Sequence, residues 1–79
     1  MSGHVDIKAV TWARNMAHVE RATLGKYTIR IDPGMDSVGW SVWDDEGAYL
    51  PTMQGRTPTV TEAKVAALQS IKVKEIHDA

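Results

Sequence analysis

The chain contains no cysteine and no phenylalanine among its 79 residues. Without cysteine, the protein has no disulfide, no thiolate zinc site and no cysteine nucleophile. Without phenylalanine, the three tryptophans and two tyrosines must supply the aromatic packing. A chain of this length makes one domain with a small core, and oligomerisation is a usual way to stabilise such a domain.

The chain also lacks an excess of charge and a long apolar run. Nine lysines and arginines stand against ten aspartates and glutamates, so no global electrostatic force draws the protein to nucleic acid. No stretch approaches the roughly 18–20 apolar residues of a membrane span, and the first residues have neither the basic nor the apolar region of a signal peptide. We therefore expect a soluble, cytoplasmic protein with a flexible N-terminus at residues 1–8 and a single domain at residues 9–79.

Two segments alternate apolar and polar side chains in the manner of strands. Residues 26–32 have the clearest alternation, and residues 39–44 repeat it after a turn built on Asp32-Pro33-Gly34. The Leu24-Gly25 pair predicts a tight turn before the first of these strands. The side chains expected on the core face are Tyr27, Ile29, Ile31, Trp40 and Val42.

The N-terminal segment has two interpretations. Alternation predicts strands at residues 10–14 and 18–23, joined by a turn at residues 15–17. Apolar residues at helical spacing also fit a helix across residues 6–22. That helix would place Arg14 and Arg21 on its apolar face, so the strands are favoured.

The C-terminal third begins with a helix signal. Thr59-Val60-Thr61-Glu62 has the spacing of a capping box, and Pro58 stops any earlier helix. We expect a helix from residue 60 to between residues 70 and 77, with a final strand at residues 71–76 as the alternative. Before it, residues 48–50 predict a short edge-like piece and residues 51–58 a polar loop.

Together these elements predict an α+β domain, in which a three- to four-stranded antiparallel sheet packs one C-terminal helix on one face. At 100° per residue, the core side of that helix carries Val60, Ala63, Ala67, Ile71 and, at its margin, Leu68. Val65 and Ile76 fall on the opposite side, next to Gln69 and Lys72. One helix on one sheet buries a single face, so the second apolar face indicates a partner.

No motif for catalysis or for a cofactor is present. The three histidines, His4, His18 and His77, are never three or four residues apart, so they form no local metal pair. The acidic turns do not match a calcium loop, no nucleophile elbow surrounds a serine, and the glycines are too widely spaced for a phosphate loop. We expect a non-enzymatic protein without metal or cofactor.

The first functional hypothesis is therefore protein binding, by self-association as a homo-oligomer, by binding a host protein, or both. Trp43 supports it, because Trp40 and Trp43 are three residues apart and point to opposite faces of a strand. The candidate interface residues are Trp43, Tyr49, Leu50, Val65, Leu68, Lys72 and Ile76.

A second hypothesis is a weak nucleic-acid-binding module that uses the open sheet face. Its candidate residues are Arg14, Arg21 and Arg30, with Lys26 and Arg56 as further basic positions. Acidic residues lie on the same segments, as Glu20 and Asp32 do, and this mixture disfavours nucleic acid as a partner.

The order of these motifs resembles small uncharacterised proteins of actinobacteriophages. The resemblance rests on four runs: Trp12, the turn and strand Leu24-Gly25-Lys26-Tyr27-Thr28-Ile29, Gly39-Trp40-Ser41-Val42, and Thr59-Val60-Thr61-Glu62-Ala63. It implies a sheet-plus-helix accessory protein located in the host cytoplasm, and it assigns no catalytic residue. Strands followed by a helix are also similar in order to the second part of a double-stranded-RNA-binding domain. The lysine cluster of that family is missing at the helix cap, where Glu62 stands instead.

Overall fold

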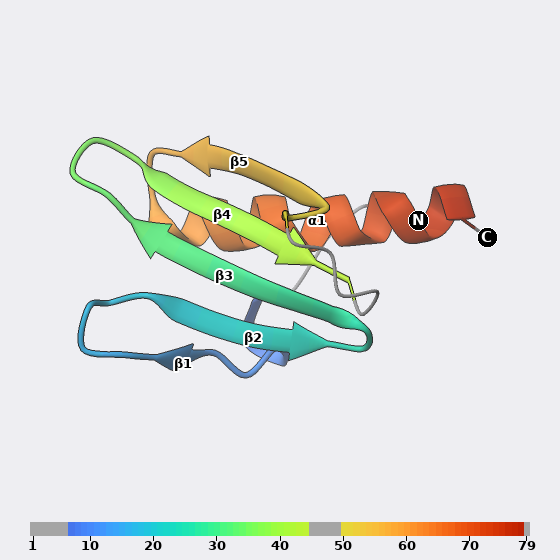
Figure 1. Ribbon diagram of the computed structural model, residues 1–79, viewed down its shortest axis with the longest axis horizontal. Coiled ribbons are helices and arrows are strands. Elements are labelled where there is room, and N and C mark those ends of the chain that lie inside the picture. Colours follow the sequence, from blue (N-terminus) through green and yellow to red (C-terminus); the bar gives the residue numbers. More distant parts are fainter. Residues whose placement is uncertain (1–6, 45–49, 79) are drawn as a thin grey trace.

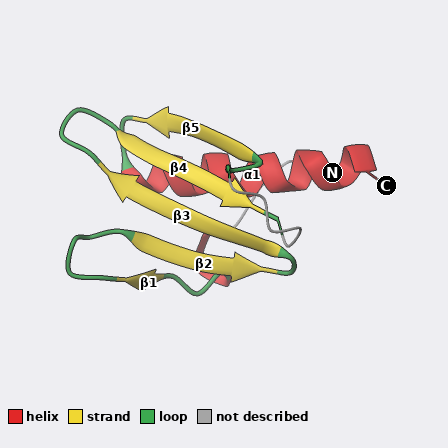
Figure 2. Ribbon diagram, viewed as in Figure 1, coloured by secondary structure: helices red, strands yellow, loops and turns green. Residues whose placement is uncertain are grey.

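The computed structural model describes residues 7–44 and 50–78. Five strands form one antiparallel sheet in chain order, and a long helix lies across one of its faces (Figures 1 and 2). The elements are η1 (Ile7–Ala9), β1 (Ala13–Arg14), β2 (Glu20–Leu24), β3 (Tyr27–Pro33), β4 (Val38–Trp43), β5 (Met53–Thr57) and α1 (Val60–Asp78).

The α+β class and the C-terminal helix are confirmed, but the expected three to four strands are too few. The additional strand is β5, which occupies the segment predicted as a polar loop. Its sequence shows no clear alternation, because Met53 is the one large apolar residue of this edge strand and Gly55 at its centre has no side chain. Of the expected edge piece at residues 48–50, Ala48 and Tyr49 lie outside the described residues, and Leu50 lies in the loop before β5.

The centre of the sheet is the β3–β4 pair. Ile29 lies opposite Val42, and Ile31 lies opposite Trp40. Ile29, Ile31 and Val42 are completely buried, and Trp40 packs against the same core cluster. The predicted core face of both strands is therefore confirmed. Such cross-strand apolar pairs fix the register, because a slip by one residue would turn every one of them to solvent.

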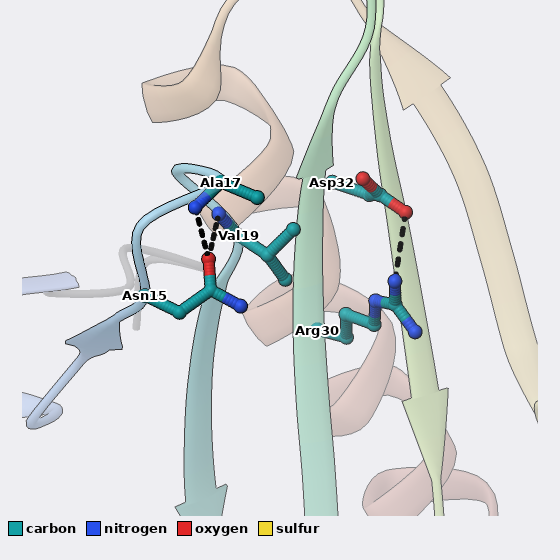
Figure 3. Close-up of polar contacts among 5 residues, drawn as sticks. All are labelled: Asn15, Ala17, Val19, Arg30 and Asp32. Atoms are coloured by element: carbon teal, nitrogen blue, oxygen red, sulfur yellow. Dashed lines mark hydrogen bonds and ion pairs between the residues drawn. The ribbon is translucent and has the colours of Figure 1, made fainter.

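The N-terminal segment forms strands, and the alternative helix over residues 6–22 is wrong. β1 is short, and a polar turn joins it to β2 (Figure 3). Asn15 Oδ1 accepts hydrogen bonds from the backbone N–H groups of Ala17, at 2.9 Å, and Val19, at 3.1 Å. His18 has a φ of 64°, a left-handed conformation that the turn imposes on a non-glycine residue. Residues 7 and 8, expected to be part of a flexible terminus, form η1 with Ala9.

Helix α1 begins with the predicted cap and runs without interruption to Asp78, so the alternative strand at residues 71–76 is wrong. Thr59 Oγ1 accepts a hydrogen bond of 3.1 Å from the Glu62 N–H, which is half of a capping box. The predicted core side is confirmed, since Ala63, Ala67, Leu68 and Ile71 are buried and Val60 packs against them. Two alanines with no exposed surface allow the helix axis to lie close to the sheet.

A charged contact fastens the helix to the N-terminal strands. Lys64 Nζ lies 2.7 Å from Glu20 Oε1, and both side chains are 14% exposed. The same ammonium group lies 4.8 Å from the centre of the Trp12 ring, within range of a cation–π interaction. The Trp12 indole in turn donates a hydrogen bond of 2.9 Å to the Ile7 carbonyl. Lys64 thereby holds β2 and the segment before β1 against α1.

The Trp40 ring packs closely on Gly55, and this contact leads to a first prediction. A methyl group at position 55 would lie 2.8 Å from Trp40 Nε1, closer than Cβ atoms approach other atoms. We expect Gly55→Ala to lower the free energy of unfolding by about 1–3 kcal/mol, because the indole must leave its place in the core. Urea denaturation followed by circular dichroism measures this change.

Gly39→Ala on the neighbouring strand is the matched control. Its new methyl group would meet nothing closer than Arg56 Nη1 at 3.5 Å, an ordinary contact. We expect its free energy of unfolding to stay within about 0.5 kcal/mol of the parent protein. Equal stabilities for the two variants would contradict the proposed packing of Trp40 on Gly55.

Candidate functional site

The face of the sheet turned away from α1 forms the first candidate surface. Figure 1 looks onto this face, with the strands in front of the helix. Side-chain alternation and the strand register together define which residues point out of it. We call it the open sheet face, and it consists of Arg21, Thr23, Thr28, Arg30, Asp32, Gly39, Ser41, Trp43, Gln54 and Arg56.

One end of the open sheet face is hollowed between two arginines and a tryptophan. Arg21, Thr28, Arg30 and Trp43 line a depression of about 250 Å³, called here the arginine–tryptophan hollow. The register places Arg21 directly opposite Arg30, and Thr28 directly opposite Trp43. Two like charges in directly opposed positions repel one another. The hollow is therefore a site where a bound anion would relieve an unfavourable interaction.

Arg30 is only partly satisfied by its neighbours. Its Nη2 donates a hydrogen bond of 3.2 Å to Asp32 Oδ2, and both side chains are exposed (Figure 3). Its Nε–H is buried and has no hydrogen-bond partner among the described residues. A surface ion pair of this kind contributes about 0–1 kcal/mol, so an incoming anion can replace Asp32 at little cost.

A second depression lies farther along the same face. It has a volume of about 470 Å³, and its lining includes Gly39, which has no side chain to fill it. Asp32, Ser41, Gln54 and Arg56 contribute polar walls. Arg56 is held in place by a hydrogen bond of 2.6 Å from its Nε to Ser37 Oγ, so its terminal nitrogens remain directed to the face.

The second candidate surface lies at the C-terminal end of α1, which extends beyond the sheet in Figure 1. After Ile71, none of the described side chains of the helix is buried. Val73 is 53% exposed and Ile76 is 67% exposed. We call this the helix-end surface, and it consists of Val10, Leu24, Lys72, Val73, Glu75 and Ile76.

Two adjoining hollows give the helix-end surface its shape. An apolar groove of about 370 Å³ runs between the helix and the end of β2, with Val10 and Leu24 on one side and Ile71 on the other. A smaller hollow of about 220 Å³ lies beside Val73 and Ile76. Lys72 borders both of them. The exposed apolar side chains and the groove therefore belong to one continuous surface.

The structure scatters the candidate interface residues over several places. Lys72 and Ile76 lie on the helix-end surface, while Val65 is half-buried. Leu68 is 5% exposed and belongs to the core, and its side chain also lines the groove. The remaining residues are Trp43, half-buried on the open sheet face, Leu50, exposed in a loop, and Tyr49, outside the described residues.

Val73 and Leu24 belong to the helix-end surface but were not among the candidates. The available signal for Val73 was its position three residues before Ile76, which places both on one side of a helix. No sequence signal indicated Leu24, because its proximity to the helix depends on where the β2–β3 turn lies against α1.

The three arginines of the nucleic-acid hypothesis do not share one face. Arg21 and Arg30 are neighbours on the open sheet face, but Arg14 pairs with Glu20 and therefore lies on the helix side of β1. The third arginine on the open sheet face is Arg56 of β5. The acidic residue Glu20 is likewise turned to the helix side, where it contacts Lys64.

Comparison with protein-family models, with curated proteins and with solved structures gives no match. The described side chains include no group of three or more histidines, aspartates or glutamates placed to hold a metal ion. Within residues 7–44 and 50–78, no helix has the length and apolar character that crossing a membrane requires.

One further buried polar group lies away from both surfaces and generates a prediction. The Tyr27 hydroxyl is buried in the core, and no described residue forms a hydrogen bond with it. A buried hydroxyl without a partner is destabilising, so Tyr27→Phe should raise the free energy of unfolding by about 1 kcal/mol. Urea denaturation measures the change, and a loss of stability in this variant would show that the hydroxyl has a partner in solution.

Proposed function

We propose that this protein is a protein-binding module that acts by pairing with a second copy of itself through the helix-end surface. The observation that carries the proposal is the exposure of Val73 and Ile76 beside an apolar groove. Large apolar side chains grouped around a groove mark binding surfaces, whereas single exposed ones are ordinary. A host protein is the alternative occupant of this surface.

The magnitudes favour a weak dimer. Fully burying a valine or isoleucine side chain contributes about 1.5–3 kcal/mol. At the exposures of Val73 and Ile76, we expect roughly half of that from each, or about 4 kcal/mol from the four side chains of a pair. Association costs about 4 kcal/mol at the least. The groove contacts must supply the surplus, so we expect a dissociation constant in the micromolar range or above.

The arrangement of the surface favours a closed dimer over an open chain of copies. A two-fold axis requires that one patch be complementary to itself. Here the projecting side chains and the groove adjoin, so Ile76 of each copy can enter the groove of the other. Lys72 and Glu75 are exposed on the same surface, and neither forms a salt bridge with another described residue. Across a two-fold axis, these opposite charges can pair reciprocally.

The test is absolute mass by size-exclusion chromatography with light scattering over about a hundredfold range of concentration. The parent protein should move from 8.7 kDa toward twice that mass as concentration rises. Ile76→Asp should remain at the monomer mass throughout, because it places a charge in the apolar contact. Val65→Asp is the poorer choice, since Val65 is half-buried and its loss would also weaken the fold.

Thr61→Asp is the matched control. It adds the same charge to an exposed position of the same helix, about 22 Å away along the axis. It should associate as the parent protein does. A parent protein that stays monomeric at every concentration would overturn the proposal and leave the helix-end surface to a host protein. So would a folded Ile76→Asp variant with unchanged association.

A further inference from the structure

The open sheet face is basic although the chain as a whole is nearly neutral. Strand alternation turns Arg21, Arg30 and Arg56 to this face. Among the described strand residues, Asp32 is the only acid that shares it, because Glu20 is turned to the helix side. Three guanidinium groups against one carboxylate give the face the charge of a surface that binds anions.

The two depressions on this face lie along one direction. The arginine–tryptophan hollow is lined by the row of Thr28 and Trp43, and the second depression is lined by the row of Asp32 and Gly39. These rows are four residues apart along β3, which corresponds to about 13 Å. Ser41 and Gln54, which line the second depression in the same row as Arg30, can both donate and accept hydrogen bonds. The face thus offers a basic and polar track with an aromatic wall at one end.

We propose that the open sheet face binds a single-stranded polynucleotide. Arg21 and Arg30 hold a phosphate at the arginine–tryptophan hollow, Trp43 stacks on an adjacent base, and Arg56 holds a second phosphate at the other depression. Aromatic stacking combined with arginine contacts to the backbone is the usual way in which proteins bind single strands without a duplex. Stacking on Trp43 requires a base whose face is exposed, and a duplex does not present such a base.

The local electrostatics favour an anion at this position. The directly opposed Arg21 and Arg30 repel one another in the unbound protein, and a phosphate between them turns that repulsion into two attractions. Asp32 competes for Arg30 through a single exposed contact at 3.2 Å, which is weak enough to be exchanged. Arg56 is already oriented by Ser37, so less freedom is lost when it binds a phosphate.

This inference is independent of the proposed dimer. The open sheet face and the buried side of α1 lie on opposite faces of the sheet, and the two surfaces share no residue. A variant that stays monomeric can still bind nucleic acid, and a variant that loses nucleic acid can still form a dimer. The mass measurement and the binding measurement therefore succeed or fail separately.

The test is fluorescence anisotropy with labelled oligo-dT and oligo-U of about twelve nucleotides, with a duplex of the same length beside them. Both single strands should bind more tightly than the duplex. The tighter-binding strand of oligo-dT and oligo-U indicates whether the site prefers deoxyribose or ribose. With two phosphates neutralised, the dissociation constant should rise about sevenfold between about 50 mM and about 200 mM salt.

Substitutions on the two faces of the sheet test whether binding occurs on the open sheet face. Arg21→Ala and Arg30→Ala should each weaken binding and reduce the slope of log Kd against log salt, by up to about 0.7. Trp43→Ala should weaken binding about five- to hundredfold, and Trp43→Tyr should retain most of it because the ring still stacks. Arg14→Ala removes the same charge from the other face of β1 and is the matched control, with an expected change below about twofold.

Three outcomes would overturn the inference. The first is equal binding of the duplex or of a polyanion without bases, such as polyphosphate or polyglutamate, since charge alone would then explain the affinity. The second is an equal loss in Arg14→Ala and Arg21→Ala. The third is an absence of binding at low salt. Circular dichroism checks each variant, and the exposed Arg21 keeps the test valid even when a Trp43 variant does not fold.

Discussion

The packing of one helix against one face of a five-stranded sheet is the constraint on which the other features of this protein depend. Ala63 and Ala67 have no exposed surface, and their small side chains let α1 approach β3, β4 and β5 closely. Within residues 7–44 and 50–78, no second α-helix covers the other face of the sheet. The residues on that face must therefore be compatible with water or with a partner, and the helix must end beyond the sheet that supports it.

Two different surfaces follow from that arrangement. Strand alternation sends the arginines of β2, β3 and β5 to the open sheet face, while the one acid of β2, Glu20, points to the helix and pairs with Lys64. The helix continues past Ile71, its last buried side chain among the described residues. Beyond it, Lys72 and Glu75 line an apolar groove together with Leu24. A basic polar face and an apolar helix end would suit partners of different chemistry.

Much of the fold could be predicted from local patterns, and the failures have specific causes. The alternation around Ile29 and Ile31, and the cap at Thr59, depend on neighbours in the chain, so the sequence is sufficient to find them. Strand β5 was missed because it is stabilised by pairing with β4 and turns only one large apolar side chain, Met53, to the core. Helical spacing placed Ile76 away from the core side of the helix, and Arg21 was proposed for the open sheet face as a basic residue of a strand. Arg14 was misplaced because the β1–β2 register decides its face.

The sequence by itself determined which residues are apolar, where the helix cap and the turn before β3 lie, and which sides of β3, β4 and α1 enter the core. These properties act over a few residues, through backbone preference and the burial of apolar side chains. Only the tertiary structure decided which charges share a face and which exposed side chains adjoin a groove. Arg21, Arg30 and Arg56 come together through strand pairing, and Leu24 meets the helix end through the position of a turn. Contacts between residues far apart in the chain have no periodicity to reveal them, because the register and the docking of the helix create them.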